Sequence, residues 1–331
     1  MRTQEIESRV FTSFRPCGMV DASGIRIAQP PGDRVSCPSR LVVPTGLIRT
    51  EADGGARAWD VCGEAIEMIR RWSQGDADDH MGEEILVRTG DRVRRHPWWR
   101  ARARLTLALL ARLGVRPPAR ILDAGCGWGV TLEALERGGY NAVGLDVSPR
   151  ILAALDRPDR TLIEADLKQP LPAEPDPGGF DAVLALDVIE HLDDDRAAVD
   201  ALGSLAAPGT GRVVVSVPAR PDLFSEFDSV QGHRRRYLPD RLRSAFDGSG
   251  LAVESIFWWG AWMTPILRRR VGRKEAGAED SPAEVYLRHL RLPPWPGPQA
   301  LDLAYALEHP WALRGKLRTG TSLFAVARRT G

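Results

Sequence analysis

The chain is poor in the features that mark disulfide-rich, zinc-binding and membrane-spanning proteins. Its 331 residues include four cysteines, and no two of them form a C-x-x-C pair. We therefore expect free thiols in a reducing compartment, and neither a disulfide framework nor a zinc ribbon. The most apolar run, residues 256–267, is shorter than the roughly 20 residues that a spanning helix needs. The N-terminal segment lacks the apolar stretch of a signal peptide. These absences predict a cytoplasmic protein with no transmembrane span.

The chain also lacks an excess of charge of either sign. Lys and Arg number 45 against 44 Asp and Glu, which gives a formal net charge of +1, and only three of the cations are lysines. Without a global basic field a nucleic-acid partner is disfavoured, and any anion-binding surface must be local. The hydrophobic share of 43% and the charged share of 27% are ordinary globular values and exclude disorder, collagen or coiled coil for the whole chain.

Two regions differ in their hydrophobic pattern. Residues 1–90 contain short β-like runs separated by Gly and Pro, then a predicted short helix at 63–72, and indicate a small α+β region of unknown role. Residues 91–331 begin with a predicted helix at 98–113 and continue as apolar runs alternating with helical segments. This alternation predicts a doubly wound α/β fold with a mostly parallel sheet. Seven strands are expected, at 120–124, 142–145, 161–165, 182–186, 212–217, 251–258 and 321–327, with a helical insertion at about 262–318.

The first of these strands ends in a glycine-rich turn, Ile121-Leu-Asp-Ala-Gly-Cys-Gly-Trp-Gly129. Its three glycines allow a tight strand-to-helix turn whose backbone approaches a ligand closely. Val130 stands where the dinucleotide fingerprint G-x-G-x-x-G requires glycine, so the spacing suits a ligand without a pyrophosphate. Asp146, at the end of the second strand, is placed to accept hydrogen bonds from ribose hydroxyls. The alternative is a structural turn and a surface aspartate.

These residues carry a resemblance to the class I S-adenosylmethionine-dependent methyltransferases, and within them to a bacterial type 11/12-like subgroup associated with glycan and metabolite gene clusters. The matching motifs lie in residues 98–260: the helix HPWWRARARL leads in, and LDAGCGWG, GLDVSP, EADL and FDAVLALDVIEHL follow at the first four strands. The resemblance implies a Rossmann-like seven-stranded sheet of order 3-2-1-4-5-7-6 with strand 7 antiparallel. It also implies S-adenosyl-L-methionine as the cofactor.

The resemblance assigns roles around that cofactor. The glycine loop would hold its methionine end with Asp123 helping to orient it, and Asp146 would hold the ribose. Asp166 and Leu167 match the pair that brackets adenine. Arg102 is a candidate for the cofactor carboxylate, with a solvated helix face as the alternative. The complete expected set, with Leu186 on the cofactor floor, is Arg102, Asp123, Gly125, Gly127, Gly129, Asp146, Asp166, Leu167 and Leu186.

A second polar group is expected on the acceptor side of the same strand ends. Asp187, Glu190 and His191 have i, i+3, i+4 spacing, which on a helix directs all three the same way, and His233 follows the fifth strand. Methyl transfer to a hydroxyl requires removal of its proton or polarisation of its oxygen by a metal. The group resembles the E-x-x-E-H plus downstream His of ubiquinone-pathway O-methyltransferases and small-RNA 2′-O-methyltransferases, where it coordinates a metal, although Asp187 replaces the first Glu.

Three roles remain open for these four residues. They could together hold Mg²⁺ or another divalent cation, they could supply a metal-free histidine base, or they could form a structural polar cluster. Three nearby features are also of interest. The arginines at 234–236 suit a phosphate or carboxylate, or a solvated face, and Trp128 is expected to cover the cofactor entrance. Residues 257–262, FWWGAW, with arginines at 268–270, suit a sugar-stacking wall, a lipid-tail pocket, an interfacial contact or core packing.

The sequence therefore predicts an S-adenosylmethionine-dependent O-methyltransferase whose acceptor is a sugar hydroxyl of a glycan, glycolipid or glycosylated metabolite. The alternatives are a phenolic or quinone-like small molecule as acceptor, or a non-catalytic scaffold that binds S-adenosylmethionine. An RNA 2′-hydroxyl is disfavoured by the near-zero net charge. A weak contact with a membrane surface is the remaining expected partnership.

Overall fold

A computed structural model describes residues 48–50, 56–59, 65–66, 69–72, 83–169, 171, 178–272 and 280–331. The chain divides into two compact units, residues 1–45 and residues 46–331, and every described residue lies in the second. A small antiparallel sheet there contains β1 (Ile48–Thr50), β2 (Ala56–Trp59) and β3 (Ala65–Ile66).

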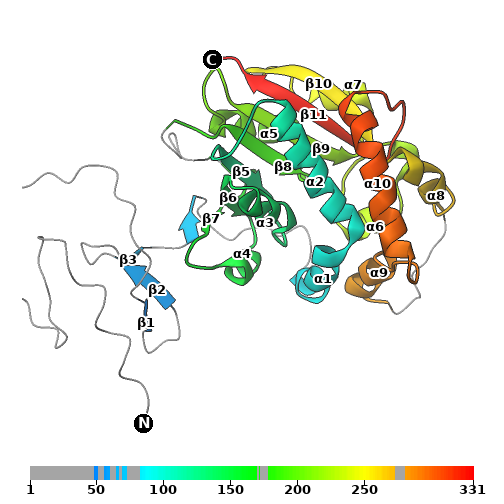
Figure 1. The fold of residues 1–331 in the computed structure, drawn as a ribbon, viewed down its shortest axis with the longest axis horizontal. Helices are drawn as coiled ribbons and strands as arrows, with labels where there is room; N and C mark the ends of the chain where they lie inside the picture. The colour runs from blue at the N-terminus through cyan, green and yellow to red at the C-terminus, as the bar shows by residue number, and fades with distance from the viewer. Residues whose placement is uncertain are drawn as a thin grey trace, which may run out of the picture. The chain divides into compact units, whose positions relative to one another are not determined.

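The main sheet has eight strands in the order β10-β11-β9-β8-β5-β6-β7-β4 (Figure 1). The strands from β4 to β9 are parallel, and β11 enters antiparallel between β9 and β10. The seven expected strands are β5 to β11, so the predicted order 3-2-1-4-5-7-6 is confirmed. Their bounds are β5 (Arg120–Ala124), β6 (Asn141–Asp146), β7 (Thr161–Glu164), β8 (Ala182–Leu186), β9 (Arg212–Pro218), β10 (Leu251–Trp259) and β11 (Ser322–Arg329).

The prediction of seven strands is wrong by one, because β4 (Ile69–Arg71) pairs with the outer edge of β7. The backbone N–H of Trp72 continues this pairing by donating to the carbonyl of Glu164 at 2.8 Å. The Arg71 guanidinium also pairs with the Glu164 carboxylate at 3.0 Å. The helix predicted at 63–72 is likewise wrong, since its described residues form β3 and β4. The parallel strand β7 pairs the backbone N–H and C=O groups of β4. Such pairing with a distant strand leaves no periodic pattern in the local sequence.

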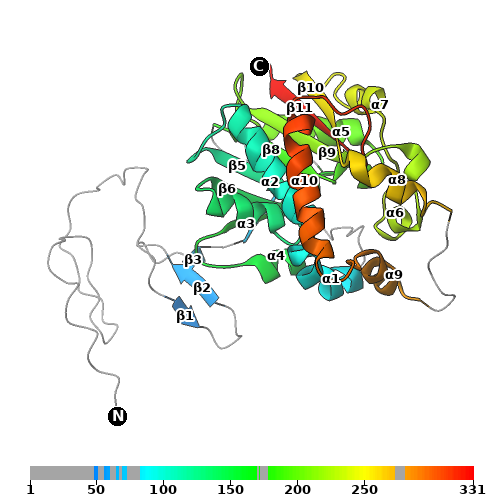
Figure 2. The same ribbon diagram turned by 45° about the vertical axis from the view of Figure 1, so that its right-hand side comes forward.

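Helices cover both faces of the main sheet. One face carries α2 (Pro97–Arg112), α3 (Val130–Arg137) and α10 (Gly297–Leu313), and the views in Figures 1 and 2 both place α2 beside α10. Trp259 is fully buried on this face, against the rings of Trp98, Tyr305 and Phe324. The other face packs against α5 (Asp195–Leu205) and α7 (Pro239–Ser244). Both faces are apolar along the central strands, as a parallel sheet requires.

The expected helical insertion lies between β10 and β11. It contains η3 (Ala261–Met263), α8 (Thr264–Arg268), α9 (Pro282–His289) and α10. Ser281 and Glu284 form a capping box that begins α9, with Pro282 in its first turn. No helix among the described residues is long and apolar enough to cross a membrane. The remaining elements are α1 (Glu83–Arg95), α4 (Pro149–Leu155), η1 (Ile189–His191), η2 (Pro221–Leu223) and α6 (Glu226–Val230).

Candidate active site

A cavity of about 770 Å³ opens at the carboxyl ends of the parallel strands. This is the edge where open α/β sheets bind ligands, and the volume is typical of a ligand pocket. The residues that follow β5, β6, β7 and β8 line one side, while α2, α6 and the insertion line the other. Of the expected cofactor-binding residues, all but Gly129 line the cavity, and of the expected acceptor-side residues all but Glu190 do so.

The glycine loop forms the floor beside β5. Gly125, Gly127 and Gly129 have φ values of 73°, 48° and 76°, a region that side-chain-bearing residues rarely adopt. A Cβ on Gly125 would lie 2.5 Å from Val188, and one on Gly129 would lie 2.8 Å from Leu155. No atom lies within 4 Å of the position of a Cβ on Gly127, which lines the cavity. The flanking glycines therefore permit close packing, and Gly127 leaves its backbone accessible to a ligand.

Two buried carboxylates stand beside this loop. The Asp146 carboxylate accepts hydrogen bonds from the backbone N–H groups of Gly127 at 2.8 Å and Ser148 at 3.0 Å, so it fixes the loop against the end of β6. Burial raises the pKa of Asp146, and these backbone hydrogen bonds oppose the shift. Oδ2 of Asp123 is buried and accepts no hydrogen bond from the described residues. Burial is also the main cause that raises the pKa of Asp123 to about 7.

Arg102 lines the cavity, but its guanidinium already has partners there. It donates to the Asp187 carboxylate and, at 3.3 Å, to the carbonyl of Leu186, and it lies over the Trp98 ring. The Asp187 carboxylate also accepts from Ser216 Oγ at 3.1 Å. A contact from Arg102 to a cofactor carboxylate remains a prediction. The carboxylate that pairs with Arg102 belongs to Asp187, the first residue of the expected acceptor-side group.

The predicted helical geometry from Asp187 to His191 is not formed. Asp187 has a φ of 58°, and the single turn of 3₁₀ helix begins only at Ile189. The backbone N–H of Asp187 donates to the Ser216 carbonyl at 2.9 Å, and this hydrogen bond stabilises the sparsely populated backbone conformation of Asp187. The turn directs the Asp187 carboxylate to Arg102, and Asp187 is not among the residues whose ligand atoms converge at Glu190.

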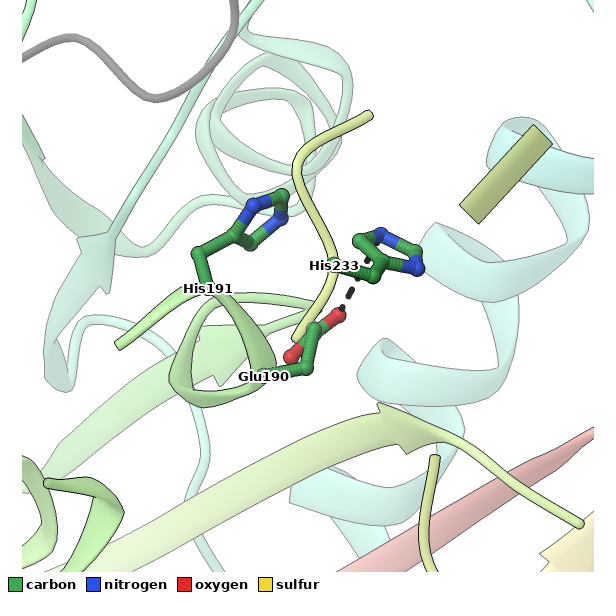
Figure 3. A group of neighbouring side chains, drawn as sticks. All are labelled: Glu190, His191 and His233. Carbon is green, nitrogen blue, oxygen red and sulfur yellow. Dashed lines mark ion pairs between the residues drawn. The ribbon is translucent and has the colours of Figure 1, made fainter. Parts of the chain in front are cut away.

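Glu190, His191 and His233 come together, as Figure 3 shows, and one ligand atom from each lies within 4.8 Å of the others. The imidazole rings of His191 and His233 meet edge to face at 4.8 Å, and Nε2 of His233 is 3.9 Å from Oε1 of Glu190. Glu190 is fully buried, and neither of its oxygens accepts a hydrogen bond within the described part of the chain. Burial, and then the charge of Asp187, raise the pKa of Glu190 well above its ordinary value.

The residue that orients His233 is Asp228, which the sequence analysis missed. Nδ1 of His233 lies 2.9 Å from Oδ1 of Asp228, and the same oxygen accepts from Nε of Arg236 at 2.8 Å. Burial raises the pKa of Asp228, but the hydrogen bonds and positive charge of His233 and Arg236 outweigh it and bring the value to about 2. Asp228 is thus ionised and can only accept, so Nδ1 of His233 carries the hydrogen, and in a neutral imidazole Nε2 is then the nitrogen that can accept a proton.

The three arginines after His233 form hydrogen bonds and ion pairs with neighbouring segments. Arg234 donates through its backbone to the Glu190 carbonyl at 2.9 Å and through Nε to the His191 carbonyl at 2.8 Å. Arg235 and Arg236 pair with Asp195 and Asp228. These contacts draw the loop after α6 onto η1 and explain how His233 reaches Glu190. Phe257, Trp259 and Trp262 pack into the core on the α10 side of the sheet, and Trp258 packs against the core on the other side, which is the core-packing alternative for this aromatic run. Trp128 lines the cavity and lies close to Gly90 of α1, and its role over the cofactor entrance stays a prediction.

Comparisons with known proteins agree with this architecture. Residues 98–256 match the model of a family described as a methyltransferase domain. A stretch of 114 residues is 32% identical to the ubiquinone biosynthesis O-methyltransferase of Xanthomonas campestris pv. campestris, and covers 33% of this chain and 47% of that protein. The protein of the same name from Xylella fastidiosa is 38% identical over 103 residues, 30% of this chain and 41% of its own length.

The chain thus spans less than half the length of these curated relatives. Among solved structures, an S-adenosylmethionine dependent methyltransferase from Mesorhizobium loti is 20% identical, with a TM-score of 0.41, over 67% of this chain and 96% of that one.

Proposed function

Residues 98–256 of this chain form a class I S-adenosylmethionine-dependent methyltransferase domain, and from this premise we propose that the protein transfers a methyl group to a hydroxyl oxygen of a phenolic or quinone-like small molecule. One observation carries the proposal. The glycine loop, the two carboxylates beside it and a histidine whose Nδ1 faces the Asp228 carboxylate line a single cavity.

The residues present fit S-adenosylmethionine, which supplies an electrophilic methyl group on a positively charged sulfonium. Gly127 offers a backbone that no side chain covers. The unpaired Oδ2 of Asp123 suits a positively charged group, and the Asp146 carboxylate retains lone pairs for two ribose hydroxyls. Asp166 and Leu167, both buried, line the same cavity beyond Asp146 and would border the adenine.

His233 supplies the base on the acceptor side. The acceptor oxygen forms its bond to the methyl carbon as the carbon–sulfur bond breaks and the bonding pair returns to sulfur. The hydroxyl proton passes to Nε2 of His233, and the ionised Asp228 stabilises the imidazolium that results. The products are the methyl ether, S-adenosylhomocysteine and a proton that His233 releases to solvent.

The acceptor-side trio permits a second role for His233. Glu190, His191 and His233 are donors that would suit a divalent cation, with Asp187 outside the set because it pairs with Arg102. Such an ion would make the acceptor hydroxyl easier to deprotonate. Treatment with a chelator separates this role from that of a metal-free base.

The curated relatives favour a phenolic or quinone-like acceptor over the sugar hydroxyl expected from the sequence, because both are named for ubiquinone biosynthesis. Apolar side chains that line the cavity from η2, α6 and the insertion suit an aromatic ring with an alkyl substituent. They include Leu223, Phe227, Ile266, Leu267, Tyr286 and Leu290. The sugar acceptor has no comparable support and becomes the alternative outcome of the assay below.

The acceptor class is testable with defined compounds. Purified protein and methyl-labelled S-adenosylmethionine are incubated with alkyl esters of 3,4-dihydroxybenzoate and, in parallel, with a panel of nucleotide sugars and glycosides. We expect label in a methyl ether of the catechol, identified by mass spectrometry, with kcat/KM rising as the alkyl chain lengthens. Label confined to the sugars would contradict the phenolic acceptor. Binding of S-adenosylmethionine with no methyl transfer to either panel would favour the alternative of a non-catalytic scaffold that binds S-adenosylmethionine.

Cofactor affinity should depend on pH through Asp123. Because the pKa of this carboxyl is about 7 in the free protein, it is largely protonated at pH 5.5, and binding of a cationic ligand requires its ionised form. Affinity for S-adenosylmethionine should therefore rise from pH 5.5 to 7, by close to tenfold per unit at the acidic end. Calorimetry in two buffers of different ionisation heat measures the released proton.

The Asp123→Asn variant provides the control. It should bind the cofactor more weakly at pH 7, with little pH dependence and no proton release. The stability of the free protein should change with pH in the opposite direction, because an acid whose pKa in the folded protein lies above its ordinary value of 3.8 loses stability as pH rises through that interval. Asp123→Asn should therefore raise the Tm of the free protein at pH 8. A pH-independent affinity for the parent protein would contradict this role of Asp123.

A further inference from the structure

The outer side of α10 is apolar and exposed. Leu303, Leu307 and Trp311 follow one another at four-residue spacing with 60%, 65% and 57% of their surfaces exposed, and Trp295 before the helix is 80% exposed. The other exposed positions between 300 and 311 are Ala300, Ala306 and Pro310, so no charged residue is exposed along this stretch. We call these six positions of the helix, with Trp295, the α10 face. Figures 1 and 2 place α10 at the surface of the molecule.

The fold uses only the opposite side of this helix. Tyr305 and Ala312 are buried in the core, and the Glu308 carboxylate accepts a hydrogen bond from the backbone of Ala261 at 2.8 Å. The α10 face contributes nothing to these contacts. A contiguous apolar surface of this kind on a well-anchored helix is typical of a protein-interaction or membrane-interaction site.

The charges around the α10 face are positive. No acidic residue follows Glu308 in the sequence, whereas Arg314, Lys316 and Arg318 are exposed at the end of the helix. Nζ of Lys316 lies 5.6 Å from the centre of the Trp311 ring. The other acid of α10, Asp302, pairs with Arg100 and Arg104. If a second copy of the chain docked through its own α10 face, its α10 helix would offer no free acidic group to Arg314, Lys316 and Arg318. The charge pattern therefore favours an anionic partner over a second copy.

The shape and composition of the face favour a lipid surface over a protein. One exposed side of a single helix offers no groove for a partner helix, whereas an apolar helix side can lie in the headgroup region of a bilayer. Tryptophans stand at both ends, and their apolar rings with one N–H group suit that boundary. We propose that the α10 face docks on a membrane surface containing anionic lipids, with Arg314, Lys316 and Arg318 at the headgroups.

The cavity lies on the other side of the same segment. Leu301 and Tyr305 of α10 line it, and so does Pro293, two residues before Trp295. Docking through the α10 face would therefore leave one helix between the lipid surface and the cavity. The proposal concerns binding alone and does not rest on methyl transfer.

Co-sedimentation of the full chain with vesicles tests the proposal without a methyl donor. Vesicles of 30% phosphatidylglycerol in phosphatidylcholine are compared with pure phosphatidylcholine. We expect selective binding to the anionic vesicles that weakens with salt. The double variant Leu303→Glu/Leu307→Glu should bind at least tenfold more weakly. Lys316→Gln and Arg318→Gln should each cost about fivefold, from the attraction of about 1 kcal/mol per cation near an anionic surface.

Leu238→Glu is the matched control, because Leu238 is half exposed at the N-cap of α7 and outside the α10 face. It should bind as the parent does, and thermal melts should show that all variants are folded. The proposal is overturned if the parent fails to bind anionic vesicles, or if the double variant binds equally well. It is also overturned if the parent is a dimer that the double variant dissociates without changing vesicle binding, because the face would then be an interface between copies.

Discussion

Replacement of His233 by alanine is expected to lower kcat about 10²- to 10⁴-fold, the usual contribution of a positioned general base. The variant removes the imidazole that Asp228 orients, and this ring otherwise faces Glu190 and His191, which are not among the expected cofactor-binding residues. Cofactor affinity, measured by calorimetry, should therefore stay within a factor of two. His309→Ala, a histidine of α10 outside the cavity lining, should retain the parent rate. Equal loss of rate and cofactor affinity would show that His233 acts through the fold.

Asp228→Asn tests the positioning role separately. An asparagine of the same shape can donate to Nδ1 and so favour the tautomer whose Nε2 carries the hydrogen, which cannot accept the acceptor proton. We expect a fall in kcat with little change in KM. The acidic limb of the pH–rate profile should move to lower pH, because the imidazolium loses a neighbouring negative charge. A purely structural role would lower the Tm without moving the profile.

A chelator distinguishes the base from a metal ligand. If His233 acts as a free base, EDTA leaves the parent rate unchanged and His191→Ala retains most activity. If the trio holds a divalent cation, EDTA abolishes activity, and His191→Ala and Glu190→Gln share the loss of His233→Ala. Unchanged rates in both histidine variants would eliminate both roles together.

The parts of the fold that the sequence predicted are those whose signal is local. The central strands are short apolar runs followed by glycine turns or helix caps, so both their order along the chain and their parallel character follow from pattern. The strand Ile69–Arg71 has no such signal, because one apolar residue and two arginines do not alternate over a useful length. Its pairing with β7 depends on residues more than 90 positions away.

The same limit applies to the site. The glycine loop and Asp146 adjoin in the structure as their positions at two successive strand ends suggest. The pairing of Arg102 with Asp187 joins residues 85 positions apart, and no spacing rule encodes it. Asp228 did have a local signal, since Ser225 and Asp228 form a capping box five residues before His233. Such a box begins α6, and its aspartate also faces the histidine.

Replacement of Asp146 by alanine is expected to weaken S-adenosylmethionine binding by roughly 10²-fold or more, since hydrogen bonds to a charged group contribute about 1.5–3 kcal/mol each. The carboxylate has two functions that alanine removes at once. It would accept from the ribose, and it holds the Gly127 and Ser148 N–H groups, so its loss also releases the glycine loop from the end of β6. Calorimetry gives the dissociation constant, and Asp146→Asn, which keeps the shape, should lose less.

Asp181→Ala separates these two functions from the general effect of losing an aspartate at a strand end. The Asp181 carboxylate also accepts a backbone N–H, that of Arg120 at 2.7 Å, but at the amino ends of β5 and β8 and outside the cavity lining. It should cost some stability and leave the dissociation constant unchanged. If both aspartate variants weakened binding equally, the affinity would reflect sheet integrity, and the glycine loop with Asp146 would no longer account for cofactor recognition. A loss confined to Asp146 places that recognition at the carboxyl edge of the sheet, where the acceptor and His233 must also meet the methyl group.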